Sequence, residues 1–166
     1  STTQRIQDVS EADYDFVFDT NVRGAFFVAQ EVGKRMLARA RGAAPGSFTG
    51  GRIINIASMA GLRVLPQIGV YCMSKAAVVQ MTKALALEWG RFGITVNAIM
   101  PGPFGTEMNL PLMNDPEVYK AFISKIPLGR WGNLDEIGGI AVFLASDAGS
   151  FVTGAGYLID GGWTVN

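Results

Sequence analysis

A short apolar run followed by a long helical stretch constrains the fold of this chain more than any other feature. Residues Arg52 to Ala57 (RIINIA) have the length and the branched apolar content of a buried parallel strand. The helical stretch begins near Val70 and continues to about Arg91, with Gly93 as its expected stop. A second apolar run, Ile94 to Ile99, follows directly. This order of strand, helix and strand predicts an α/β protein with a parallel sheet.

The start of the predicted helix carries a phenol and an amine one turn apart. Tyr71 and Lys75 have i, i+4 spacing, so they lie on one helix face with Cβ atoms about 6 Å apart. An ammonium that close to a phenol favours the phenolate, and such a tyrosine can act as a general acid or base near neutral pH. Ser58 adds a hydroxyl where the strand ends, the edge at which open α/β sheets bind ligands. A structural interpretation stays open, since serines commonly end strands and structural pairs also perturb pKa values.

An asparagine interrupts a second predicted helix near the N-terminus. Ser10 is the expected N-cap, acids follow it in the first turn, and the helix should reach about Arg41. Asn21 lies inside this helix, although asparagine is a poor helix former because its side chain competes for backbone hydrogen bonds. On an apolar helix face it needs a partner or a water. An ordinary buried polar residue is the alternative.

The C-terminal third supplies the rest of the predicted sheet. A helix from Leu134 to Ala145 and a strand near Tyr157 to Ile159 bring the probable parallel strands to about three. Residues 103–133 are expected to be irregular, with one helix from Asp115 to Ile126. This segment is interpreted as a mobile cover of the substrate, with a plain surface excursion as the alternative.

The composition excludes several classes of protein. Of the 166 residues, 49% are hydrophobic and 17% charged, which suits a single domain over residues 1–166 with a buried core. Lys+Arg and Asp+Glu number 14 each, so charge gives no case for nucleic acid binding. The absence of histidine excludes Ser-His-Asp hydrolysis and any histidine metal site within this chain, and no metal is expected. The single Cys72 fits a reducing cytoplasm, and neither a membrane span nor a signal peptide is visible.

Four motifs, in order from about Val9 to the last residue, resemble the short-chain dehydrogenase/reductase family. They are Asn21 in TNVRGAF, Ser58 with Tyr71 thirteen positions on and then Lys75, Pro101-Gly102 with Thr106 in NAIMPGPFGTEM, and the C-terminal VTGAGYLIDGGWTVN. The resemblance implies the C-terminal part of a Rossmann-like, doubly wound parallel sheet with flanking helices. The sequence looks closest to the classical, 3-oxoacyl-[acyl-carrier-protein] reductase-like branch, although sugar and steroid dehydrogenases share these motifs.

The resemblance further implies an NAD(P)-dependent oxidoreductase that interconverts a secondary alcohol and a ketone by hydride transfer. In reduction, Tyr71 would give a proton to the carbonyl oxygen and Ser58 would hydrogen-bond it. Lys75 would assist Tyr71 and hold the nicotinamide ribose, and Asn21 would support a water relay toward Lys75. The residues implied to bind the cofactor are Tyr71, Lys75, Pro101, Gly102, Phe104 and Thr106. The implied substrate is a small alcohol or ketone or an acyl thioester, and the implied assembly is a homodimer or homotetramer.

The glycine-rich half of a dinucleotide site is missing from the sequence. It contains neither G-x-G-x-x-G nor T-G-x-x-x-G-x-G, the turns that let a backbone approach a pyrophosphate. The resemblance implies that roughly the first third to two fifths of a family member is absent, including the residue that selects NAD or NADP. A catalytically silent fragment that only associates with partner chains is therefore the alternative function. A hydrolase using Ser58 would lack both a histidine and a G-x-S-x-G elbow.

Overall fold

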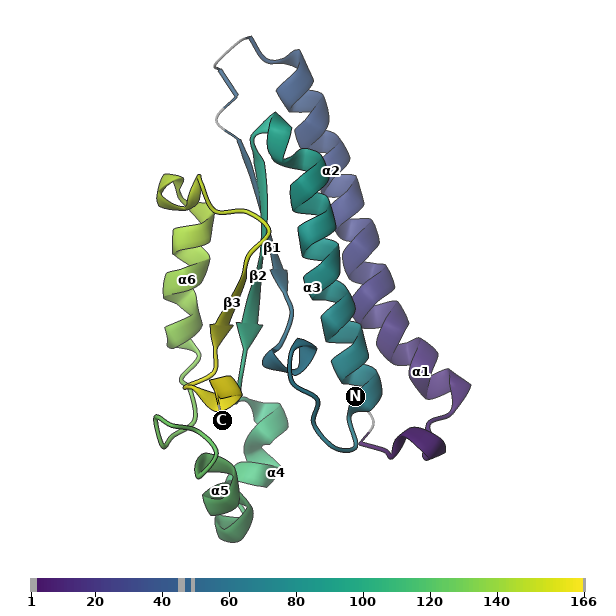
Figure 1. Ribbon diagram of the computed structural model, residues 1–166, viewed down its shortest axis with the longest axis vertical. Helices are drawn as coiled ribbons and strands as arrows, with labels where there is room; N and C mark the ends of the chain where they lie inside the picture. Colours follow the sequence, from purple (N-terminus) through teal and green to yellow (C-terminus); the bar gives the residue numbers. More distant parts are fainter. Residues whose placement is uncertain (1–2, 45–46, 49, 166) are drawn as a thin grey trace.

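The computed structural model describes residues 3–44, 47–48 and 50–165 and shows three parallel strands flanked by helices (Figure 1). The strands are β1 (Gly51–Ile56), β2 (Ile94–Pro101) and β3 (Gly156–Ile159). The helices are α1 (Glu11–Phe18), α2 (Ala25–Gly42), α3 (Gly69–Trp89), α4 (Leu110–Met113), α5 (Pro116–Ile123) and α6 (Asp135–Ala145). A π-helical segment, η2 (Asp19–Gly24), joins α1 to α2. Short 3-10 turns cover Ile6–Asp8, Met59–Gly61, Gly90–Phe92, Glu107–Asn109, Asp147–Gly149 and Trp163–Val165.

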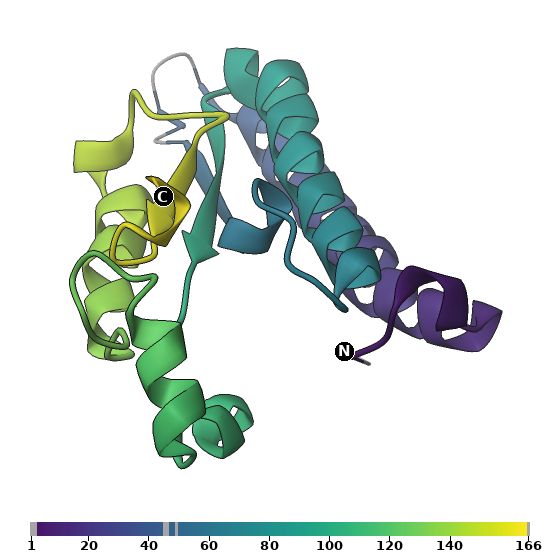
Figure 2. The ribbon, with the colours of Figure 1, turned by 60° about the horizontal axis from the view of Figure 1, so that its bottom comes forward.

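The sheet has the order β1-β2-β3, and both strand pairs are parallel. Ile53 lies opposite Val96, and Ile99 lies opposite Tyr157, which makes β2 the central strand. Helices α2 and α3 cover one face of the sheet and α6 covers the other (Figure 2). Coverage of both faces is typical of doubly wound parallel sheets. The α/β fold class predicted from the sequence is confirmed.

Strand β2 is buried along nearly its whole length, because strands flank it on both edges and helices cover both faces. Its residues Ile94, Val96 and Ala98 pack in clusters with the apolar face of α3. Asn97 points to the other face, where its amide donates to the Val152 carbonyl at 2.7 Å and its Oδ1 accepts from an N–H at 3.1 Å. The buried polar group is thus hydrogen-bonded on both sides, as burial requires.

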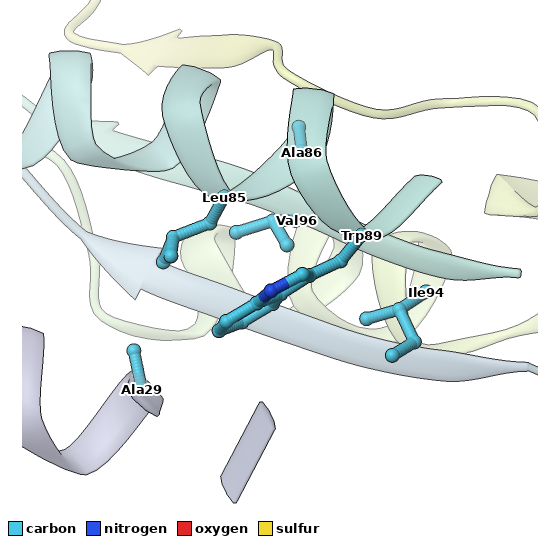
Figure 3. Close-up of a cluster of buried hydrophobic side chains, with 6 residues drawn as sticks. All are labelled: Ala29, Leu85, Ala86, Trp89, Ile94 and Val96. Carbon is cyan, nitrogen blue, oxygen red and sulfur yellow. The ribbon is translucent and has the colours of Figure 1, made fainter. Parts of the chain in front are cut away.

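A core cluster joins α2, α3 and β2 around one tryptophan (Figure 3). Its members are Ala29, Leu85, Ala86, Trp89, Ile94 and Val96. The Trp89 ring lies against Gly33 of α2, and a Cβ built on that glycine would be 2.3 Å from the Trp89 ring atom Cη2. Helix α2 can therefore approach α3 at this point only because residue 33 has no side chain.

Strand β1 forms one edge of the sheet, and no strand of the described chain pairs with its outer side. Ile56 at its end is 55% exposed although it is an apolar strand residue. An unpaired strand edge offers its N–H and C=O groups to another strand. In the described chain, the outer side of β1 is therefore a bare strand edge.

The predicted elements are found with shifted boundaries. The helix of residues 70–91 begins at Gly69, ends at Trp89 and is followed by a 3-10 turn, and Gly93 stops it with a left-handed φ of 73°. The strand predicted to end at Ile99 continues to Pro101. The prediction of a single helix within residues 103–133 is wrong, because two α-helices, α4 and α5, lie there. The predicted end at Ile126 is also three residues too late, since α5 ends at Ile123.

Two negative findings apply to the described residues. None of their helices combines the length and apolar character needed to cross a bilayer. They also contain no group of three or more His, Cys, Asp or Glu side chains that could hold a metal ion.

Candidate active site

Ser58 lies just beyond the C-terminal end of β1, where the strand turns into a 3-10 turn. Its backbone is extended, and its Oγ accepts a hydrogen bond from the Ala60 N–H at 3.1 Å, so the side chain caps the turn. The residue is 8% exposed. The turn packs tightly on α3, since a Cβ built on Gly61 would lie 2.9 Å from the Lys75 carbonyl oxygen. This contact fixes Ser58 relative to the start of α3.

Tyr71 and Lys75 lie on the first two turns of α3, which begins at Gly69. The Lys75 Nζ lies 5.7 Å from the centroid of the Tyr71 ring. It also donates a hydrogen bond of 3.0 Å to the carbonyl oxygen of Ile56, the last residue of β1. Burial lowers the pKa of Lys75, because desolvation disfavours the ammonium. The Ile56 carbonyl, two residues before Ser58 in the chain, therefore holds the Lys75 side chain beside Tyr71.

Asn21 reaches α3 from the π-helical segment. Its Nδ2 donates to the Ser74 Oγ at 3.0 Å, and the Ser74 hydroxyl donates in turn to the Tyr71 carbonyl at 2.7 Å. Ser74 is completely buried. Single π-helical turns within α-helices are frequent at functional sites. The side chain of Asn21 thus connects to the tyrosine's own backbone, and the water relay toward Lys75 stays a prediction.

Ser74 is a residue that the sequence analysis did not identify. It stands between Tyr71 and Lys75, and a serine inside a helix has no signature that separates a structural link from a solvent-facing side chain. The available signal was its position: at i+3 from Tyr71 its hydroxyl can bond the tyrosine carbonyl.

The segment predicted to border the nicotinamide follows β2. Gly102 packs on Asp160, and a Cβ built on it would lie 2.4 Å from the Asp160 Cβ. Phe104 is buried and forms an isolated parallel bridge with Gly132. The Thr106 Oγ1 accepts a hydrogen bond of 3.3 Å from Asn109. The Ala57 N–H donates to the Ile99 carbonyl at 2.8 Å, so the ends of β1 and β2 are adjacent. The segment from Pro101 to Thr106 therefore begins beside Ser58.

Asp160 organises the turn that follows β3. Burial acts most strongly on this carboxyl and raises its pKa, but hydrogen bonds from Thr164 and Gly162 together lower the pKa below its ordinary value. The carboxylate accepts from the Thr164 N–H at 2.9 Å, the Thr164 hydroxyl at 2.7 Å and the Gly162 N–H at 3.0 Å. The turn therefore holds an ionised side chain against Gly102.

The parallel sheet and these strand-end residues agree with the comparisons with known proteins. A family profile described as "Enoyl-(Acyl carrier protein) reductase" matches residues 1–164. The chain belongs to the short-chain dehydrogenase/reductase family.

Individual relatives are named for the oxidation of hydroxy compounds. Gluconate 5-dehydrogenase of Gluconobacter oxydans (strain 621H) is 40% identical over 161 residues, which are 97% of this chain and 59% of the relative. The structure of a gluconate 5-dehydrogenase from Burkholderia cenocepacia J2315, in complex with NADP and tartrate, has a TM-score of 0.89 and 36% identity, covering 100% of this chain and 63% of that one. A 4-hydroxyisoleucine dehydrogenase complexed with NADH has a TM-score of 0.92 and 32% identity, covering 99% and 65%. The chain thus spans about three fifths of the length of these relatives.

Proposed function

We propose that this chain is the catalytic half of an NAD(P)-dependent oxidoreductase that interconverts a secondary alcohol and a ketone. The observation that carries the proposal is the gathering of Ser58, Tyr71 and Lys75 where β1 ends and α3 begins. Relatives that bind NADP and NADH with the same fold support it. Residues 1–166 then form a single, incomplete Rossmann-like domain.

In the proposed reduction, the side chains of this chain handle the proton. Tyr71 gives its phenolic proton to the carbonyl oxygen, and Ser58 donates a hydrogen bond to the same oxygen. Lys75, held by the Ile56 carbonyl, stabilises the phenolate that Tyr71 becomes. Asn21 holds the π-helical segment against α3 through Ser74 and supports a water relay toward Lys75.

The residues at the strand ends fit the nicotinamide end of the cofactor. Tyr71 and Lys75 are both partly exposed at this edge, and the segment from Pro101 to Thr106 starts at the adjacent strand end. In the proposal, Lys75 holds the nicotinamide ribose, while Pro101, Gly102, Phe104 and Thr106 border the ring. The cofactor, when bound, supplies or accepts the hydride. The choice between NAD and NADP is left to residues outside this chain.

The proposed substrate is a small polyhydroxy acid or its keto form. The relatives named for gluconate and 4-hydroxyisoleucine, and the tartrate in one structure, support a hydroxyl compound that carries a carboxylate. An acyl thioester is the second candidate, because the matching profile is described as a reductase of acyl carrier protein substrates. The proposed location is the cytoplasm, supported by a single buried thiol at Cys72.

We also propose that the enzyme assembles as a homodimer or homotetramer through α2 and α3. Phe27 and Val28 of α2 are 51% and 66% exposed, and Leu87 of α3 is 86% exposed. Exposed large apolar side chains on neighbouring helices favour burial against another subunit. Light scattering that finds a monomer at micromolar concentration would count against this assembly.

The test of the proposed chemistry is Tyr71→Phe in the full-length enzyme. Loss of a positioned general acid typically costs about 10²- to 10⁴-fold in rate, so turnover should fall by about 100-fold or more. The thermal midpoint should stay close to the parent. Tyr14→Phe is the matched control, because Tyr14 stacks on Phe18 in α1 and a phenylalanine keeps that contact. Turnover of Tyr71→Phe within a few-fold of the parent would remove Tyr71 as the acid.

A further inference from the structure

The loop of residues 62–68, between Ser58 and Tyr71, contains a strained backbone position. Gln67 has a φ of 63°, and it is the sole non-glycine residue with positive φ in the described part of the chain. The left-handed region is unfavourable for residues with a Cβ, so such a conformation persists only where the surroundings hold it. The neighbours of Gln67 therefore identify what shapes this loop.

The N-terminal strap, residues 4–8, holds the loop from one side. The backbone N–H of Gln4 donates a hydrogen bond of 2.7 Å to the Gln67 carbonyl oxygen. Two residues further along each segment, Ile6 packs on Gly69, since a Cβ built on Gly69 would lie 3.1 Å from Ile6 Cδ1. The N-terminal strap lies beside the start of α3 in both views (Figures 1 and 2). The strap thus contacts the chain on both sides of Ile68.

The strap is in turn anchored to α1. The Gln4 side chain donates from Nε2 to the Asp13 Oδ2 at 3.1 Å, and the Ser10 hydroxyl donates to the same oxygen at 2.7 Å. The Ser10 Oγ accepts from the Asp13 N–H at 3.1 Å and so caps α1. The hydrogen bonds from Ser10 and Gln4 lower the pKa of Asp13, which keeps its carboxylate ionised as their acceptor. One glutamine therefore links the capped start of α1 to the strained loop.

The strained loop leads directly into the first turn of α3. The Cys72 N–H donates to the Ile68 carbonyl at 3.0 Å, and Gly69 is the first helical residue. Tyr71 lies four positions after Gln67. A change in the loop at Gln67 would reach Tyr71 within one helical turn.

We propose that Gln4 is a positioning residue, which holds Gln67 in its left-handed conformation and thereby fixes the first turn of α3 with Tyr71. The inference rests on the proposed function only in naming Tyr71 as the acid. The hold on the loop is a property of the described residues themselves. Gln4 acts through two hydrogen bonds: its backbone N–H bonds the Gln67 carbonyl in the loop, and its side-chain amide bonds Asp13 in α1.

Gln4→Pro in the full-length enzyme tests the hold directly, because proline lacks the N–H that bonds the Gln67 carbonyl. Amide hydrogen exchange in a peptide covering residues 62–72 should become about tenfold faster or more. kcat should fall by about tenfold, while the KM for the cofactor stays within about twofold. Arg5→Pro is the matched control: Arg5 is exposed, its φ of −69° already suits proline, and Gln4 keeps its N–H.

A rescue variant separates positioning from general damage. Glycine adopts positive φ without the Cβ penalty, so Gln67→Gly should restore loop protection and most of kcat in the Gln4→Pro background. If Gln4→Pro alone does not fold, recovery of a folded double variant supports the proposal, and its failure to fold overturns it. Unchanged exchange of the loop in Gln4→Pro, or no rescue by Gln67→Gly, also overturns it. Hydrogen exchange measures the loop directly and does not depend on turnover. This test of Gln4 therefore remains valid even if Tyr71→Phe retains activity.

Discussion

At the scale of single residues, Ser74 is the part of the site with the sharpest prediction. Ser74→Ala removes the bridge from Asn21 to the Tyr71 carbonyl and leaves the Asn21 amide without that acceptor. Asn21 is half-buried, so its unpaired donor costs at most the roughly 1–3 kcal/mol of a fully buried one, and the free energy of unfolding should fall by up to that amount. kcat should fall as well, with the KM for the cofactor nearly unchanged.

Ser124→Ala provides the matched control for Ser74. The Ser124 hydroxyl makes the same i to i−3 bond, to the Ala121 carbonyl at 2.9 Å. Ser124 follows the last residue of α5, is exposed, and its hydroxyl has no second partner in the described chain. Chemical denaturation of both variants compares them directly. Equal losses of unfolding free energy for the two alanine variants would mean that the Asn21 link contributes nothing.

The sequence singled out the side chains of the proposed site but not the groups that hold them in place. Ser58, Tyr71 and Lys75 were recognisable because their chemistry and spacing are carried by side chains. The Ile56 carbonyl that holds Lys75 was not, since any residue at that position supplies the same backbone oxygen. The positive φ of Gln67 was missed for a related reason: glutamine is not a residue that marks a left-handed turn.

At the scale of elements, Gly33 tests the packing of α2 on α3. Gly33→Ala places a Cβ 2.3 Å from the Trp89 ring, which cannot shift freely because Trp89 is 9% exposed. Overpacking costs about 1–3 kcal/mol and outweighs the gain of up to about 1 kcal/mol in helix propensity. The free energy of unfolding should therefore fall. Gly138→Ala in α6 is the control: its new Cβ meets open space, so the free energy of unfolding should rise by about 0.5–1 kcal/mol. Denaturant midpoints of the two variants that move in the same direction would contradict the packing argument.

The start of α6 carries a pH-dependent ion pair. Hydrogen bonds from Arg130 and then from the Asn133 N–H lower the pKa of Glu136 to about 2. A depressed carboxyl pKa stabilises the folded state above the ordinary value of 4.5, and this contribution is lost as the pH falls toward 2. The thermal midpoint of the parent should exceed that of Glu136→Gln at pH 7, and the gap should close between pH 4.5 and 2. A gap that stays constant over this range would refute the assigned pKa.

The elements themselves followed from the sequence to within a few residues. The apolar runs of β1 and β2 and the left-handed stop at Gly93 are local signals that tertiary contacts did not override. Residues 103–133 were predicted less well, because short helices such as α4 and α5 depend on what they pack against. The π-helical segment around Asn21 was also missed, since its one extra residue per turn leaves no clear mark in the apolar pattern.

At the scale of the whole molecule, the proposed cofactor residues make up only part of a dinucleotide site. Affinity for a dinucleotide comes largely from the pyrophosphate on a helix N-terminus and from ribose and adenine contacts. The proposed cofactor residues, from Tyr71 to Thr106, reach only the nicotinamide end. The 166-residue chain by itself should therefore bind NADH and NADPH weakly or not at all and show no dehydrogenase activity. Calorimetric titration of mass-verified material checks this, and micromolar binding to either cofactor would show that the site is misplaced.

The open outer edge of β1 suits this chain to fragment complementation. The proposed catalytic residues, from Asn21 to Lys75, lie on one continuous piece of chain that folds around its own sheet. A parallel strand supplied by a second polypeptide could pair along the outer side of Gly51–Ile56, which no strand of the described chain occupies. The full-length protein could therefore be split at this edge into two separately produced polypeptides. Recovery of turnover on mixing would then report that the two polypeptides associate.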